Sequence, residues 1–229
     1  MSTAQIIDDK NNRLIQMIRK AEICWDYIYR TDVLQKEKIG FLARKCEKVI
    51  DFGKSSREHY ALFRRDQAIT VDINQGDDYP DIIDDLCDIS SLPPMSADGI
   101  VCLAVLEHVY DPFRATDNLH MLLKEGGYCF AYVPFLYRYH AAKDLCYQDY
   151  FRYTRDGTAL LFKNFSKVTI YPVRGTYSTI ANIWQPWKYR VEKIFGQRLN
   201  KWIDRIGTAI SNSQNNNLQA SGFYIWAEK

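Results

Sequence analysis

Two short apolar segments end in residues that could bind a polar ligand. Asp51 and Gly53 end the segment EKVIDFG (47–53), and Asp72 lies near the end of QAITVDI (67–73). A glycine at such a turn lets the backbone approach a ligand closely, and the start of a following helix offers free N–H groups. An acidic residue about 20 residues further along is placed to accept hydrogen bonds from ribose hydroxyls. The pattern therefore predicts a site for a ligand that carries a ribose.

A third acidic residue extends this predicted site. Asp88, followed by Ile89, comes after the apolar segment PDIIDDL (80–86). Its carboxylate could bind the amine edge of an adenine ring while the apolar neighbour packs against the face of the ring. Together with the ribose-binding residue, this pair indicates an adenosine moiety.

Three further residues are candidates for moving a proton. Glu107 and His108 follow the segment DGIVCLAV (98–105), and His140 lies in a later stretch rich in tyrosine. An imidazole titrates near neutral pH, so His140 or His108 could act as a general base. The alternatives are that Glu107 fixes a loop, that His108 lines the rim of a pocket and that His140 is a surface residue. No metal-ligand spacing stands out, so no metal site is expected.

The elements that must position these residues follow from the alternation of apolar and helical patterns. Short apolar segments separated by helical stretches predict an α/β fold with a parallel sheet covered on both faces. In such a sheet, ligands bind beyond the carboxyl ends of the strands, where the acidic residues lie. The expected strands are 47–53, 67–73, 80–86, 98–105, 126–135, 166–173 and 220–229. The expected helices are 4–30, 33–45, 57–66, 111–124 and 154–165.

Four segments are expected along the chain. They are a helical extension (1–45), a ligand-binding core (46–173), an insert (174–219) and a terminal strand (220–229). Within the insert, 182–196 and 199–210 are helical candidates. We expect them to pack on the domain; the alternatives are a lid or acceptor wall, a dimer contact, or an interfacial helix pair over 182–210 that touches lipid.

Composition narrows the class of protein. Apolar residues make up 47% of the 229 residues, charged residues 25%, and the formal net charge is +2. This balance is ordinary for a globular domain and gives no reason to expect nucleic acid as a partner. None of the six cysteines forms a C-x-x-C pair, which favours reduced thiols. With neither a secretory signal nor an apolar run of membrane-spanning length in view, a cytoplasmic location is expected.

Five motifs follow one another in a recognisable order. They are VIDFG, VDI, DISSLP, DGIVCLAVLEHV and LLKEGGYCFAYVPF. This order resembles the class I S-adenosylmethionine-dependent methyltransferases, in the small-molecule group called type 11. The resemblance covers about residues 47–173. Its most specific part is VLEHV followed by Asp111-Pro112 and then LLKEGG.

The resemblance implies a fold, a cofactor and a set of contacts. The fold would be a Rossmann-like, seven-stranded, mostly parallel sheet with an antiparallel terminal strand and helices on both faces. The cofactor would be S-adenosylmethionine. Asp51 and Gly53 would shape the pocket for its methionine part, Asp72 would hold the ribose, and Asp88 with Ile89 the adenine. The full set of implied cofactor-binding residues is Asp51, Gly53, Ser55, Asp72, Ile73, Asp88, Ile89, Ala104 and Val105.

One departure from the family pattern bears on cofactor binding. Family members usually carry three glycines in the first loop, but Ser55 and Arg57 stand where the second and third would be. Serine is small enough to be tolerated. Arg57 could hold the methionine carboxylate, or it could fill the pocket.

The segment HAAKDLCYQDYFRYT (140–154) looks like a segment of bacterial members linked to glycan and natural-product modification. The expected function is therefore O-methylation of a sugar, glycan or other small molecule, with a place in polysaccharide biosynthesis and with a homodimer as one option. Because of Ser55 and Arg57, a non-catalytic binding or assembly protein is the alternative. An RNA or protein methyltransferase is a weaker third hypothesis, since the chain lacks a basic stripe.

Overall fold

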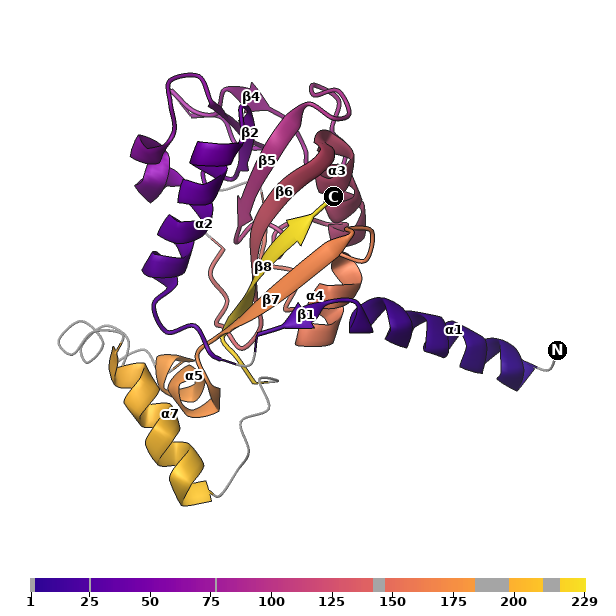
Figure 1. The fold of residues 1–229 in the computed structure, drawn as a ribbon, viewed down its shortest axis with the longest axis vertical. Coiled ribbons are helices and arrows are strands. Elements are labelled where there is room, and N and C mark those ends of the chain that lie inside the picture. The colour runs from indigo at the N-terminus through magenta and orange to yellow at the C-terminus, as the bar shows by residue number, and fades with distance from the viewer. Residues whose placement is uncertain (1–2, 25, 77, 142–146, 184–197, 212–218) are drawn as a thin grey trace.

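The fold is built around one eight-stranded sheet. This computed structural model describes residues 3–24, 26–76, 78–141, 147–183, 198–211 and 219–229. The strand order is β1-β7-β8-β6-β5-β2-β3-β4 (Figure 1). β8 pairs antiparallel with both β6 and β7, and the other paired strands run parallel. A mostly parallel sheet with an antiparallel terminal strand is thus confirmed.

The bounds of the elements are as follows. The strands are β1 (Glu22–Ile23), β2 (Val49–Phe52), β3 (Ala68–Asp72), β4 (Ile82–Ile83), β5 (Ala97–Leu103), β6 (Leu123–Pro134), β7 (Lys167–Val173) and β8 (Gly222–Glu228). The helices are α1 (Thr3–Arg19), α2 (Thr31–Lys45), the 3₁₀ helix η1 (Arg57–Leu62), α3 (Pro112–Leu122), α4 (Arg155–Leu161), α5 (Thr176–Ile183) and α7 (Arg198–Ser211).

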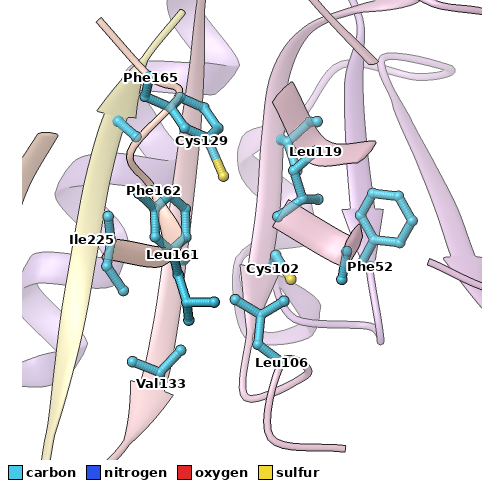
Figure 2. Packing of buried hydrophobic residues seen from close by; sticks show 14 of the residues in the cluster. Phe52, Cys102, Leu106, Leu119, Cys129, Val133, Leu161, Phe162, Phe165 and Ile225 are labelled. Atoms are coloured by element: carbon cyan, nitrogen blue, oxygen red, sulfur yellow. The ribbon is translucent and has the colours of Figure 1, made fainter. Parts of the chain in front are cut away.

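Both faces of the sheet are buried, each in its own apolar cluster. Neighbouring residues of one strand enter different clusters because side chains alternate across a strand: Cys102 packs toward α3 and α4, whereas Val101 packs toward α2. Figure 2 shows part of the α3–α4 side, with Leu119 and Phe162 packed near sheet residues. This double burial explains why the strands read as continuous apolar runs.

Local capping fixes where the covering helices begin. Asp111 accepts a hydrogen bond from the backbone N–H of Arg114 at 3.0 Å, and Pro112 is the first residue of α3. Thr154 likewise accepts from the backbone N–H of Gly157 at 3.1 Å at the start of α4. A capping side chain followed by proline is a typical helix start. The segment after β5 therefore turns sharply into α3.

The predicted helix 4–30 and the count of seven strands need correction. The helix ends at Arg19, and residues Glu22–Ile23 add an eighth strand that runs parallel to β7. The backbone N–H of Cys24 donates to the carbonyl of Ile170 at 2.9 Å. The open edge of β7 offers unpaired backbone groups, and pairing with them outweighs the helical pattern of the sequence.

Two other predicted elements are shorter than expected. The helix expected over 57–66 is the 3₁₀ helix η1, which ends at Leu62, where the backbone N–H of Phe63 donates to the carbonyl of Tyr60 at 3.0 Å. The strand expected over 80–86 is β4, with only two residues. After β4 the chain therefore leaves the sheet earlier than the sequence predicts, which changes the residues that lie at the end of this strand.

α5 and α7 pack against each other beside the sheet (Figure 1). Buried Asp204 of α7 joins them, because it accepts from the backbone N–H of Ser178 at 2.9 Å and of Gly175 at 2.8 Å, and from the Tyr29 hydroxyl at 2.9 Å. The helix expected over 199–210 is confirmed, whereas residues 184–196 of the other helical candidate lie outside the described residues. The division into four segments stays a prediction.

Among the described residues, no helix combines the length and the apolar character needed to cross a membrane.

Candidate functional site

A cavity opens at the carboxyl edge of the parallel strands. Its volume is about 800 Å³ when the space open to solvent is included. The lining residues come from the last residues of β2 and β3, from the segments that follow β2, β3, β4 and β5, and from one later stretch. They are Phe52, Gly53, Val71, Asp72, Ile73, Asp84, Asp85, Leu86, Ala104, Val105, His108, Val109, Tyr110, Tyr147 and Tyr150. The site thus lies where an open parallel sheet places its ligands.

Gly53 lets the turn after β2 touch the turn after β5. Its φ is +68°, a left-handed conformation that favours glycine. A Cβ on this residue would lie 2.6 Å from Cγ2 of Val105. No side chain fits there, so bare backbone faces the cavity at this point.

Asp51 holds the same turn in place through hydrogen bonds from inside the protein. Its carboxylate is fully buried and accepts from the backbone N–H of Ser55 at 2.9 Å, the Ser56 hydroxyl at 2.7 Å and the Tyr60 hydroxyl at 2.6 Å. Burial raises the pKa of Asp51, although these hydrogen bonds act in the opposite direction. Asp51 does not line the cavity, so it positions the loop that does.

Ser55 explains part of the departure from the three-glycine pattern. Its hydroxyl donates to the carbonyl of Phe52 at 2.5 Å and accepts from the backbone N–H of Leu103 at 2.7 Å. The side chain therefore ties the end of β2 to the end of β5 and does not line the cavity. Arg57 is exposed and is also not a lining residue, so it does not fill the pocket.

Asp72 ends β3 and lines the cavity, as does Ile73 beside it. Its carboxylate accepts from the backbone N–H of Asn74 at 2.9 Å and from the Tyr79 hydroxyl at 2.8 Å. A carboxylate offers about four lone-pair sites, so it can still accept from a ligand. Burial and the neighbouring carboxylate raise the pKa of Tyr79, which keeps its hydroxyl protonated as a donor.

Asp88 and Ile89, which the resemblance predicts to hold the adenine, are not among the lining residues of this cavity. The Asp88 side chain is 71% exposed and pairs with Arg114. Asp84, Asp85 and Leu86 line the cavity in their place. The reason is the early end of β4 at Ile83, after which the chain turns along the cavity before it reaches residue 88.

Ala104 and Val105 follow β5 and line the cavity. Ala104 has a φ of +56°, a conformation that costs a residue with a Cβ about 1–2 kcal/mol. Its backbone N–H donates to the carbonyl of Tyr132 at 3.1 Å, which holds the strained turn in place. Strain of this kind is common at ligand-binding sites.

Glu107, His108 and His140 come together next to the cavity. The Glu107 side chain is fully buried, and its Oε1 lies 3.4 Å from Nε2 of His140 and 3.8 Å from Nε2 of His108. The two imidazole rings are 5.0 Å apart between centroids. Of the two predicted bases, His108 lines the cavity and His140 does not.

Other polar groups hold the two histidines from outside. Nδ1 of His108 lies 2.8 Å from the carbonyl oxygen of Gln148, and Nδ1 of His140 lies 3.1 Å from Oδ2 of Asp149. The contact with Glu107 raises the pKa of His140, although burial opposes it. Burial would raise the pKa of Asp149, but Arg152 and the backbone of His140 lower it to about 2. Asp149 therefore stays an anion.

Several lining residues were not predicted from the sequence. Tyr147 and Tyr150 belong to the tyrosine-rich stretch around His140. No sequence pattern marked Tyr110, Asp84 or Asp85 as lining residues, because their positions depend on where β4 and β5 end.

Comparison with known proteins gives an independent view of the fold. Residues 54–131 match the type 11 family model, described as "Methyltransferase domain". A solved structure of a SAM-dependent methyltransferase from Archaeoglobus fulgidus is 18% identical, with 86% of this chain and 94% of that one covered and a TM-score of 0.52. Phosphoethanolamine N-methyltransferase 2 from Haemonchus contortus, solved with S-adenosyl-L-methionine, is 13% identical, with 83% of this chain and 52% of that one covered and a TM-score of 0.50. None of the curated proteins compared with the sequence matches it.

The solved structures show that the chain has the fold of S-adenosylmethionine-dependent methyltransferases. Within that fold, residues 54–131 match a methyltransferase domain.

Proposed function

We propose that the enzyme transfers a methyl group to a hydroxyl of a sugar, glycan or another small molecule. The observation that carries the proposal is the convergence of Gly53, Asp72 and His108 on one cavity that Tyr147 and Tyr150 also line. Aromatic walls suit small organic acceptors, because tyrosine combines an apolar ring face with a polar hydroxyl.

The cavity fits the cofactor in three respects. The space that a Cβ at Gly53 would need is already taken by Val105, so only backbone faces a bound molecule there. The Asp72 carboxylate accepts hydrogen bonds, as two ribose hydroxyls require. Leu86 and Val109 offer apolar surface for an adenine ring, with Asp85 beside them to accept from its amine.

S-adenosylmethionine supplies a methyl group on a positively charged sulfur, which is an electrophile. The residues of the chain must then align the acceptor, exclude water and take up a proton from the hydroxyl. Alignment alone can contribute roughly 7–11 kcal/mol at best. Since Nδ1 of His108 faces the carbonyl of Gln148, it carries the ring proton, and Nε2 is left as the acceptor.

The fold by itself does not select the acceptor, because one scaffold can serve many substrates. The hydroxyl acceptor therefore rests on His108 and the tyrosines, and on the likeness of residues 140–154 to glycan-linked members. We keep the cytoplasm as the proposed location, which is supported by the free, buried thiols of Cys46, Cys87, Cys102 and Cys129.

The test is calorimetry with S-adenosylhomocysteine, followed by transfer of a labelled methyl group to panels of acceptors. We expect Asp72→Ala to weaken binding at least tenfold, and the matched variant Asp88→Ala to leave it unchanged. Label should enter sugars, glycans or phenols and not amines. Equal loss in both variants would refute the assigned cavity, and label in amines alone would refute the hydroxyl acceptor.

The structure removes the reason for the alternative of a non-catalytic binding or assembly protein. It depended on Ser55 and Arg57 obstructing the first loop, but neither residue lines the cavity.

A further inference from the structure

Glu107, His108 and His140, which we call the Glu-His-His cluster, bring three potential ligand atoms together. A carboxylate oxygen and one nitrogen from each imidazole all lie within 4.8 Å of one another. Two histidines and a carboxylate are a common ligand set for divalent transition metals, which leave further coordination positions for water or substrate.

The orientation of both rings is fixed from outside the cluster. Nδ1 of His108 faces the carbonyl oxygen of Gln148 at 2.8 Å. Nδ1 of His140 faces two acceptors, Oδ2 of Asp149 at 3.1 Å and the carbonyl oxygen of Arg138 at 3.3 Å. In a neutral ring the nitrogen that faces these acceptors carries the proton, so each Nε2 then has a lone pair available on the side of Glu107. Metal-binding histidines are held in this way by outer acceptors.

Glu107 supplies the negative charge at the centre. Its side chain has no exposed surface, and neither carboxylate oxygen has a hydrogen-bond donor among the described residues. The two contacts to Nε2, at 3.4 Å and 3.8 Å, are close in distance but lack hydrogen-bond geometry. A buried carboxylate without a hydrogen-bond donor is unfavourable unless a positive charge lies beside it. A proton on His140 supplies such a charge, and a metal ion held by the carboxylate and both neutral rings would supply a larger one.

We infer that the Glu-His-His cluster binds a divalent transition-metal ion through Glu107 and the Nε2 atoms of His108 and His140. Metal–ligand bonds of about 2.0–2.2 Å separate neighbouring ligand atoms by roughly 3.0–3.5 Å. The observed separation of 3.4 Å fits this range, and that of 3.8 Å needs only a small movement.

Within the part of the chain that the structure describes, the surroundings offer three protein ligands. Asp149 is paired with Arg152, so its carboxylate is committed to orienting His140. The His140 side chain is 27% exposed and that of His108 is 11% exposed, so an ion can enter from solvent. The backbone carbonyl of Glu107 accepts from the N–H of Tyr150 at 2.8 Å, which anchors the ligand at the wall of the cavity.

A role for the ion rests on the proposed function. Because His108 lines the cavity, an open coordination position could hold an acceptor oxygen, and a bound cation favours loss of the proton from that oxygen. The ion would then replace the imidazole as the means of activating the hydroxyl. The reaction itself would remain methyl transfer to oxygen.

The test measures metal binding directly and needs no turnover. The metal-stripped protein is titrated with Zn²⁺ in the calorimeter and with Co²⁺ under visible absorption. We expect one site with micromolar or tighter affinity and absorption bands typical of nitrogen–oxygen coordination. Glu107→Gln, His108→Ala and His140→Ala should each weaken binding at least tenfold. His120→Ala is the matched control, because this ring packs on Phe165 outside the cluster and its loss should leave binding unchanged.

The outcomes separate this inference from the proposed function. Absence of Zn²⁺ or Co²⁺ binding at 100 µM (about a hundredfold above the expected range), or equal binding in wild type and His140→Ala, overturns the metal site. If Glu107→Gln does not fold, as judged by circular dichroism, the two histidine variants still decide the question. Binding of S-adenosylhomocysteine without metal binding leaves the proposed function standing, whereas metal binding without it refutes the cofactor site alone.

Discussion

The close approach of Gly53 to Val105 can be tested by adding a single methyl group. Gly53→Ala introduces two separate costs. The first is the left-handed backbone, since φ is +68°. The second is a clash, since the new Cβ would lie 2.6 Å from Cγ2 of Val105 and 4.0 Å from its Cβ.

The two costs can be estimated separately. A left-handed φ costs a residue with a Cβ about 1–2 kcal/mol. Forcing an extra methyl group into a filled space costs about 1–3 kcal/mol more. We therefore expect Gly53→Ala to lower the free energy of unfolding by about 2–5 kcal/mol. Binding of S-adenosylhomocysteine should weaken as well, because the displaced Val105 lines the cavity.

The chain provides a control for each cost. Gly126 has a φ of +73° with nothing within 4 Å of an added Cβ, so Gly126→Ala carries the backbone cost alone. Val105→Ala removes Cγ2. In that background Gly53→Ala should therefore lower the free energy of unfolding by the backbone cost alone, without the cost of the clash. Urea unfolding gives the stabilities of all variants, and calorimetry gives the affinities. If Gly53→Ala and Gly126→Ala lose the same free energy and bind equally well, the contact between the two turns is not as close as we describe.

Three further predictions concern other parts of the fold. Ser55→Gly should cost about 1–2 kcal/mol in urea unfolding, because the hydroxyl that bridges β2 and β5 is lost. Cofactor affinity should not change, and a tenfold loss would mean that Ser55 reaches the cavity. Burial would raise the pKa of Asp98, but Lys124 and backbone donors lower it. Asp98 therefore stabilises the fold above about pH 4 and loses this effect at lower pH. Asp98→Asn should flatten the acid side of the stability–pH curve, and an unchanged curve would contradict this. Asp204→Asn should loosen α5 and α7, because the amide keeps one acceptor oxygen where the carboxylate has two; limited proteolysis should cut there faster, and equal rates would count against the Asp204 contacts.

Much of the fold could be predicted because its cause is local. Strands buried on both faces read as continuous apolar runs, as at Val49–Phe52 and Ala97–Leu103. The start of α3 was near the predicted position, because Asp111 and Pro112 form a cap that the sequence shows directly. In contrast, β1 depends on a backbone partner in β7, which lies far along the chain and leaves no periodic signal.

The site was predicted in part for the same reason. Gly53 and Asp72 follow strands whose ends are clear in the sequence, and both line the cavity. Asp88 does not, because two-residue β4 ends earlier than its apolar run suggests. The closeness of Glu107 and His140 could not be predicted, because these residues are far apart in the sequence. The stretch that follows His140 returns to the end of β5 through long-range contacts such as that between Tyr150 and Glu107.

The position of β8 has a consequence for synthesis of the chain. β8 lies between β6 and β7, yet it is made after both. Until residues 222–228 have left the ribosome, these two long strands cannot be joined through their shared neighbour, and each has an open edge that could pair wrongly. We expect nascent chains that stop before Gly222 to aggregate and to need protection by chaperones, although the turns that line the cavity would already have been translated.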